Sequence, residues 1–343
     1  MVPHGEMTVT EQEPLNKQYK LTIIVSNYNQ EKHLAETLDS IYAQRVNYPF
    51  RVIITDDHST KDGSIDWIKD YAKAHSNIET IFAEENGGYL TNILRAKERT
   101  KTDYFCLLDV EDYWTDADFL QRAYDYLEGH PECVIYESNV EVVAEGKTKG
   151  RPFLSTKHRS GTYTKEMFLR NEPIPITQTT GMFFRNCIFR NGIPEVMENA
   201  IGTRSERSFE GDRGRFIMHL KEGPAYYDDR MVGVYRLTEG GIWNRLSKSQ
   251  KRVINARMYI DYCQYYGSHE DFFVNRAYKS LQEYILEKQR GLKELNLSAE
   301  FIDETERLMA ADVYRFCKQY EDKIIKEKGI IHKLKQAYRG FRA

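Results

Sequence analysis

The chain has 343 residues, of which 41% are hydrophobic and 13% aromatic. This composition excludes wholesale disorder and allows one large domain with a smaller one, or two domains of medium size. Lysine and arginine number 49 and aspartate and glutamate 52, so the chain lacks the large positive charge that nucleic-acid-binding proteins usually carry. We therefore expect no nucleic-acid partner.

The start of the chain predicts neither a membrane span nor a secretory signal. The apolar run Leu21–Val25 is far shorter than the roughly 20 residues that a membrane-spanning helix needs. The first twenty residues are polar, whereas a signal peptide combines a basic start with an apolar stretch. The five cysteines are widely spaced and never form C-x-x-C, which favours reduced thiols over disulfides or zinc ligands. We expect a cytoplasmic protein.

The first third of the chain alternates between strand and helix patterns. Strands are predicted at Leu21–Ser26, Arg51–Asp56, Ile78–Ala83 and Tyr104–Asp109. Helical spacing relates Leu34, Leu38 and Ile41, and later Trp67, Ile68, Tyr71 and Ala72. A further helix is predicted at Ala117–Gly129 and a strand at Cys133–Glu137. This alternation predicts an α/β fold, with a mostly parallel central sheet and helices on both faces.

The middle of the chain is less regular, and the last third is helical. Residues 151–176 are interpreted as an extended loop region, followed by strands at Thr180–Arg185 and Ala225–Leu237 with a helix at Arg213–Glu222 between them. Helices are then predicted at Ser249–Tyr266, Asp271–Gln289 and Ser298–Lys328. Phe273, Ala277, Leu281 and Ile285 form one apolar stripe in this region. We expect a polar tail at 1–20, an α/β domain at 21–246 and a helical appendage at 247–343.

Polar and acidic residues follow the predicted strands, where ligands bind in open α/β sheets. The strand ends read Ser26–Asn29, Thr55–Ser59, Glu85–Gly88 and Asp109–Trp114. Neither G-x-G-x-x-G nor G-x-x-x-x-G-K-[ST] occurs, so no glycine loop is expected to hold phosphate. An acidic ligand would be repelled by these carboxylates unless a cation bridged the two. Oxygen ligands of this kind suit Mn²⁺ or Mg²⁺.

Several segments resemble motifs of the family 2 glycosyltransferases of the GT-A fold. They are Leu21–Asn29, Ile54–Ser64, Asn86–Gly88 with Asn92, Tyr104–Asp116, Glu210–Asp212, and Tyr235–Arg236 with Gly240–Trp243. Their order along the chain makes the resemblance specific, and it spans roughly residues 21 to 243. It implies an inverting, metal-dependent glycosyltransferase with a GT-A nucleotide-sugar-binding fold. The donor would be a UDP- or dTDP-sugar, and the acceptor a hydroxyl of a surface glycan, glycolipid or glycoprotein.

The resemblance assigns the donor nucleotide to five residues. Asp57 would accept the N3–H of uracil or thymine, a proton that cytosine lacks. Ser26, Tyr28, Asn86 and Asp109 would complete the donor site. The alternatives are structural: Asp-Asp-x-Ser is ordinary turn chemistry, Tyr28 a packed aromatic, and Ser26 a strand-end hydroxyl.

Asp109 and Glu111 are the candidate metal ligands, because a two-residue step at a strand end points both side chains to one side. Glu111 stands where the family usually has Asp. Asp112 is a third candidate, or it opens the following turn. Thr238 stands where many relatives have a histidine that helps to hold the metal. Either the site uses fewer protein ligands, or Glu239 substitutes.

Asp212 is the candidate general base, which would remove the acceptor proton in a single displacement. It could also be simply a favourable first residue of the predicted helix. Glu210 is a weaker competitor for the catalytic role. Two rival functions remain open. A sugar nucleotidyltransferase would normally show a Gly- and Arg-rich loop, and Ser26–Gln30 has neither residue. A catalytically silent sugar- or partner-binding protein of the same fold is the other rival.

The end of the chain is basic and apolar in alternation. The basic residues are Lys323, Lys326, Lys328, Lys333, Lys335, Arg339 and Arg342, against one acid, Glu327. Contact with anionic lipid at the inner face of the cell membrane is one interpretation. A solvated helix end, or a contact between subunits of a homo-oligomer, is the other.

Overall fold

The computed structural model describes residues 8–9, 19–155, 157–238, 241, 243, 245–294 and 302–320. The chain divides into two compact units. The first comprises residues 1–201 and 210–239, and the second comprises residues 202–209 and 240–343. The division at residue 246 drawn from the sequence stays a prediction. The short segment 202–209 groups with the helices, although the sequence placed it in the α/β domain.

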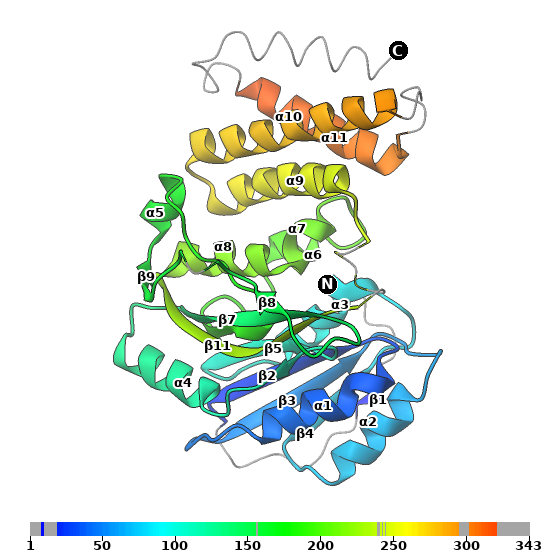
Figure 1. The fold of residues 1–343 in the computed structure, drawn as a ribbon, viewed down its shortest axis with the longest axis vertical. Coiled ribbons are helices and arrows are strands. Elements are labelled where there is room, and N and C mark those ends of the chain that lie inside the picture. The colour runs from blue at the N-terminus through cyan, green and yellow to red at the C-terminus, as the bar shows by residue number, and fades with distance from the viewer. Residues whose placement is uncertain are drawn as a thin grey trace. The chain divides into compact units, whose positions relative to one another are not determined.

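The first unit contains one sheet, which has 11 strands within the described residues (Figure 1). The strands are β1 (Thr8–Val9), β2 (Leu21–Asn27), β3 (Phe50–Asp56), β4 (Ile78–Phe82), β5 (Tyr104–Asp109), β6 (Tyr113–Trp114), β7 (Ile135–Ala144), β8 (Arg151–Pro152), β9 (Gly161–Tyr163), β10 (Met182–Arg185) and β11 (Ala225–Leu237). Their main order is β1-β4-β3-β2-β5-β10-β7-β11-β6. Strands β4, β3, β2 and β5 run parallel, as do β7 and β11. Strand β10 runs antiparallel between β5 and β7.

Helices cover both faces of this sheet (Figure 1). The helices of the first unit are α1 (Glu31–Tyr42), α2 (Ser64–Lys73), α3 (Gly88–Glu98), α4 (Phe119–Gly129), α5 (Lys165–Leu169), the 3-10 turn η1 (Thr179–Gly181), α6 (Glu195–Glu198) and α8 (Asp212–Glu222). Buried residues of α1, α2 and α4 form one core cluster with Ile23 of β2 and Ile54 of β3. On the opposite face, Asn92 of α3 bonds Thr55, and the His219 ring of α8 lies 5.6 Å from that of Phe105. The predicted α/β fold is confirmed. Its sheet is mixed, and the predicted parallel order holds for the neighbouring strands β4, β3, β2 and β5.

Several predicted boundaries were wrong. Strand β7 begins at Ile135 and continues to Ala144, beyond the predicted end at Glu137, because it pairs with the long strand β11. The predicted strand at Thr180–Arg185 begins only at Met182, since residues 179–181 form η1. Residues 151–176 contain β8, β9 and α5 in addition to loops. Helix α3, which no sequence pattern singled out, follows β4 and positions the site described below.

The second unit is helical. Its helices are α7 (Glu206–Glu210, whose last residue lies in the first unit), α9 (Lys248–Tyr266), α10 (Glu270–Glu294) and α11 (Glu304–Gln319). Helix α9 begins with a capping box, in which Ser247 Oγ accepts from Gln250 N at 3.1 Å and Gln250 Oε1 accepts from Ser247 N at 2.9 Å. The predicted stripe on α10 is buried throughout, from Phe273 to Ile285.

The described helices include none that is both long and apolar enough to cross a membrane. Helix α11 fills part of the helix predicted at Ser298–Lys328, starting after its N-cap Asp303 and ending at Gln319. The basic tail at 323–342 lies outside the described residues. Its membrane contact, and the cytoplasmic location, stay predictions.

Candidate functional site

The paired aspartates at the end of β3 have separate roles in the structure. Asp56 is fully buried, and its Oδ1 accepts from Ser59 N at 2.8 Å. Its Oδ2 accepts from Asn27 Nδ2 and from Ser59 Oγ, each at 2.6 Å. Aspartates commonly stabilise turns by accepting backbone N–H groups a few residues farther along the chain. The turn after β3 is therefore built by Asp56, which leaves Asp57 to make different contacts.

Asp57 holds the start of α3. Its Oδ1 and Oδ2 accept from the backbone N–H groups of Gly87 at 2.9 Å and Gly88 at 2.8 Å. Arg95, about two turns along the same helix, adds an ion pair at 3.2 Å. Burial raises the pKa of Asp57, and the Gly87 N–H and Arg95 partly offset that effect. Gly88 has φ of 84°, in the left-handed region that favours glycine. The glycine pair therefore brings a helix N-terminus onto this carboxylate.

The other predicted donor residues lie around this turn. Ser26, at the end of β2, is partly buried and accepts from Asn92 Nδ2 at 3.4 Å. Asn86 is exposed and donates to the Asp57 carbonyl at 3.2 Å. Tyr28 is 43% exposed and so is not a packed core aromatic. These side chains belong to the carboxyl ends of neighbouring parallel strands, as the sequence predicts.

Three carboxylates follow β5, and burial affects each of them. It raises the pKa of Asp109 to about 6, an effect that the nearby Arg215 charge opposes. It raises the pKa of Glu111 to about 7, and the negative charge of Asp109 adds to that shift. The pKa of Asp112 is raised well above its usual value, first by burial and then by Asp109. Tyr89 Oη donates to Asp109 Oδ1 at 3.0 Å. Such a cluster of like charges favours a bound cation.

Asp112 is held differently from its neighbours. Its Oδ1 accepts from Arg236 N at 2.9 Å, and its Oδ2 accepts from Thr180 Oγ1 at 2.7 Å and from Gln178 Nε2 at 3.1 Å. With no exposed surface, Asp112 ties the turn after β5 to β11 and to η1. This geometry favours the structural interpretation of Asp112. Its role as a metal ligand stays a prediction that the geometry does not support.

The residues present fit a divalent cation in part. Within the described residues, no three His, Cys, Asp or Glu side chains form a group that could hold a metal ion. Asp109 and Glu111 nevertheless supply two partly accessible carboxylates. Mg²⁺ is commonly held by one or two carboxylates, with phosphate and water as the remaining ligands. Thr238, where relatives have histidine, donates to Glu111 Oε1 at 3.5 Å. Glu239 lies outside the described residues.

Asp212 is the first residue of α8, so the helix-start interpretation is correct. Its Oδ1 accepts from Thr179 Oγ1 and from Arg215 Nη2, the latter at 3.1 Å. Its side chain is 30% exposed, which leaves it accessible to a substrate. Glu210 ends α7, and its carbonyl oxygen accepts from Arg215 Nη1 at 2.7 Å. The structure thus connects both candidate bases to one arginine.

Sequence reasoning missed Arg215, Thr179 and Tyr89. Arg215 is 2% exposed and bonds the Thr179 hydroxyl as well as Asp212. Its positive charge also acts on Tyr89 and Asp109. Arg215 is therefore bonded to the candidate base, and its charge also acts on the candidate metal ligand Asp109. Its three-residue spacing from Asp212 on a predicted helix was the signal that could have found it. No comparable signal marked Thr179, which precedes the strand predicted at Thr180–Arg185.

Comparisons with known proteins bear on the family of this chain. Residues 22–192 match the model of glycosyl transferase family 2. An uncharacterized protein of Mycobacterium tuberculosis is 30% identical over 238 residues, which cover 69% of this chain and 64% of that protein. The chain thus spans less than two thirds of that relative. The putative teichuronic acid biosynthesis glycosyltransferase TuaG of Bacillus subtilis is 25% identical over 235 residues, 68% of this chain and 85% of TuaG.

A solved structure has the same fold. The crystal structure of S. aureus TarS 1-349 in complex with UDP-GlcNAc superposes with a TM-score of 0.54 at 16% identity, covering 89% of this chain and 92% of that one. At this identity the likeness is evidence for the fold alone, and it agrees with the predicted GT-A type. Sequence match, relatives and fold therefore point the same way, and the chain belongs to glycosyl transferase family 2.

Proposed function

We propose that this family 2 glycosyltransferase moves a sugar from a UDP- or dTDP-sugar to a hydroxyl of a surface glycan or glycoconjugate, with inversion at the anomeric carbon. The observation that carries the proposal is the buried Arg215, which donates to Asp212 Oδ1 at 3.1 Å and whose charge also acts on Asp109. A donor-side carboxylate and a base candidate are thereby part of one electrostatic network. The names of TuaG and of the TarS complex support the substrate class, since they concern teichuronic acid synthesis and UDP-GlcNAc.

Asp57 is the proposed contact for the nucleotide base. A carboxylate has about four lone-pair positions, and Gly87, Gly88 and Arg95 occupy three of them. One acceptor position remains for the N3–H of uracil or thymine. Because three fixed donors hold the carboxylate in place, binding the base would require little reordering of this side chain. The exposed ring of Tyr28 is available to stack on the same base.

Asp109 and Glu111 are the proposed ligands of Mn²⁺ or Mg²⁺. A divalent cation bound there would neutralise the charge that builds on the departing nucleoside diphosphate. Thr238 orients Glu111 through its hydroxyl in place of the histidine of relatives. Arg215 balances part of the remaining negative charge on the same side. The protein contributes a fixed pair of carboxylates to this arrangement.

Asp212 is the proposed general base. The bonds from Thr179 and Arg215 both fall on Oδ1, and we assign removal of the acceptor proton to Oδ2. The two donors hold the carboxylate in place, and a general base must lie within hydrogen-bond reach of the proton that it removes. The displacement needs no covalent intermediate, and no nucleophilic serine or cysteine is invoked.

Turnover of a panel of nucleotide sugars tests this proposal. UDP-glucose, UDP-GlcNAc and dTDP-glucose would be incubated with the protein, with and without Mn²⁺, and release of the free nucleoside diphosphate measured. We expect release from at least one donor and loss of release with Asp212→Asn. UDP binding without release from any donor would favour the catalytically silent binding protein. Release of pyrophosphate from a nucleoside triphosphate and a sugar phosphate would favour the nucleotidyltransferase.

A further inference from the structure

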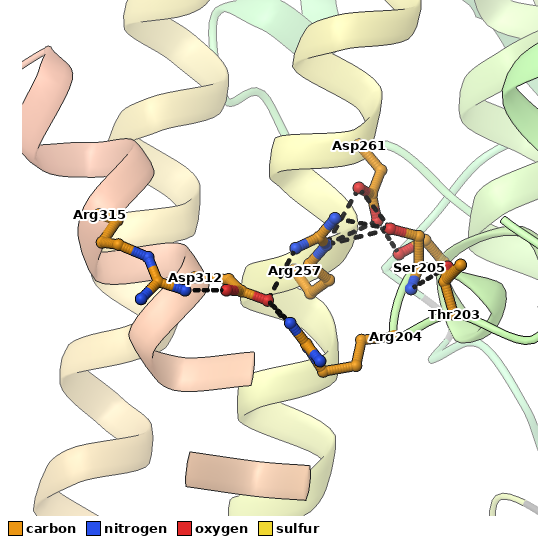
Figure 2. Close-up of polar contacts among 8 residues, drawn as sticks. Thr203, Arg204, Ser205, Arg257, Asp261, Asp312 and Arg315 are labelled. Carbon is orange, nitrogen blue, oxygen red and sulfur yellow. Dashed lines mark hydrogen bonds and ion pairs between the residues drawn. The ribbon is translucent and has the colours of Figure 1, made fainter. Parts of the chain in front are cut away.

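A short segment of the chain, residues 202–209, is bound by the helices of the second unit (Figure 2). Asp261 on α9 is 2% exposed and accepts from two serine hydroxyls, Ser205 Oγ at 3.0 Å and Ser208 Oγ at 2.5 Å. Arg257, one turn earlier on α9, donates to Asp261 Oδ1 at 3.1 Å and to Ser205 Oγ at 2.7 Å. The Arg257–Asp261 ion pair thus bonds the segment at Ser205 and at Ser208.

Helix α11 holds the same segment from another direction. Asp312 accepts from Arg204 Nε at 2.8 Å and from Arg257 Nη1 at 3.3 Å. Arg315, one turn along α11, also donates to Asp312 (Figure 2). The Asp312 side chain is 14% exposed, whereas the side chains of Arg204 and Arg315 are 40% and 63% exposed. We refer to Arg257, Asp261 and Asp312 as the 202–209 clamp.

Apolar packing completes the attachment. Tyr262 donates from its hydroxyl to the Ser208 carbonyl at 2.7 Å, and its ring meets that of Phe209 edge-on with centroids 5.5 Å apart. Phe209 and Tyr262 are both buried. Residues 204, 205, 208 and 209 are therefore all held by side chains of α9 and α11. A segment held at so many points has little freedom to move.

The chain leaves this clamp directly for the candidate base. Helix α7 ends at Glu210, and Asp212 follows after a single glycine. Three residues span at most about 11 Å, so Asp212 cannot move far from clamped Phe209. At its far end α7 is held by Arg215, which bonds both the Glu210 carbonyl and Asp212 Oδ1. A shift of α7 would therefore displace the base and the arginine that orients it.

We propose that the helical unit positions the catalytic base through the 202–209 clamp, and that Arg257 and Asp261 are positioning residues of the transfer reaction. This inference rests on the proposed function, because it takes Asp212 as the base. It gives the helices a part in catalysis, although the family match ends at residue 192. A misplacement of about 1 Å at a reacting group can cost roughly a hundredfold in rate, so a weakened clamp would lower kcat.

Asp261→Asn tests the clamp, because it keeps the shape of the side chain and removes its charge. We expect kcat for nucleotide release from the donor found in the panel to fall roughly tenfold to hundredfold. The KM for the donor and the Kd for UDP stay within about twofold, since the predicted donor residues lie elsewhere. Amide hydrogen exchange of residues 202–212 rises, whereas exchange of β2 to β5 stays unchanged. Ser208→Ala is a second variant that removes one hydroxyl and leaves the ion pair intact.

Glu306→Gln is the matched control. It weakens the Lys288–Glu306 ion pair, 2.7 Å long and mostly buried, in the same helical unit. We expect normal kcat and normal exchange of 202–212 in this variant. Equal losses of kcat in Asp261→Asn and Glu306→Gln, or normal kcat in both Asp261→Asn and Ser208→Ala, would overturn the proposal. If the unaltered protein turned over no donor, the proposed function would fail. Hydrogen exchange would then test whether the clamp holds residues 202–212. Unchanged exchange in both Asp261→Asn and Ser208→Ala would refute that role.

Discussion

Replacement of Thr179 by valine probes the orientation of the proposed base with a minimal change of shape. The Thr179 hydroxyl donates to Asp212 Oδ1 and accepts from Arg215 Nη2, and the residue is 2% exposed. Valine keeps the branched side chain and removes both bonds. A hydrogen bond to a charged group contributes about 1.5–3 kcal/mol. With about 1.4 kcal/mol per factor of ten, we expect kcat to fall between about tenfold and 150-fold.

The assay separates orientation from binding and from folding. Initial rates of nucleotide release give kcat, calorimetric titration gives the Kd for UDP, and circular dichroism gives the melting temperature. We expect an unchanged Kd, because the Thr179 hydroxyl bonds Asp212 and Arg215, neither of which is a predicted donor residue. The melting temperature falls by several degrees, since Arg215 loses a buried acceptor.

Thr179→Ser is the matched control, because it retains the hydroxyl and removes only a methyl group. We expect serine to restore most of kcat. Full activity of Thr179→Val, measured where the protein is folded, would refute the idea that this hydroxyl orients the base. Equal defects in the serine and valine variants would show that packing, not the hydroxyl, is what matters at this position.

Four further variants test the remaining roles. Asp212→Asn should leave UDP binding nearly normal and reduce transfer at least about a hundredfold; a normal rate here with a loss in Glu210→Gln would assign the base to Glu210. Asp57→Asn should weaken UDP binding more than it lowers kcat, and should also lower the melting temperature because Arg95 loses its buried partner; unchanged UDP affinity would exclude Asp57 as the base contact. Chelator should abolish transfer and Mn²⁺ or Mg²⁺ restore it, with Glu111→Gln weakening metal and donor binding together; full activity in excess chelator would contradict the metal site. Deletion after Glu321 should abolish binding to anionic vesicles, to which each basic residue contributes about 1 kcal/mol; equal binding by both proteins would favour a structural tail.

The sheet could be predicted because its strands carry a strong local signal. β2, β3 and β5 are runs of β-branched or aromatic residues that are buried on both faces. Their ends fix where a ligand binds in such a sheet, so the acidic edge followed from the order of the elements. Helix α3 was missed because its start is set by Asp57, which lies some thirty positions earlier in the chain. The hydrophobic periodicity of a short sequence window gives no information about a contact with so distant a residue.

The different roles of Asp56 and Asp57, and of Glu111 and Asp112, could not be predicted from the sequence either. Neighbouring carboxylates look alike in a motif, and their partners decide what each one does. Asp56 builds a turn and Asp57 caps a helix, while Asp112 is bonded by residues 178, 180 and 236. These partners come from distant segments, and only the folded chain brings them together. Thr179 was missed for the same reason, because its partner Asp212 lies 33 positions farther along the chain.

The attachment of residues 202–209 to the helices has a consequence for how this protein can be divided or recombined. The chain passes from the first unit to the second at residue 202, returns at 210, and leaves again at 240. The helices are therefore not a removable C-terminal module. A truncation before α9 would leave Phe209, Ser205 and Ser208 without their partners, with an apolar ring in water and a loosened entry to α8. Exchange of the helical unit between relatives would succeed only where the incoming helices carry an acid and an arginine in the register of Asp261 and Arg257. Substitutions in segment 202–209 would therefore require matching substitutions in α9 and α11.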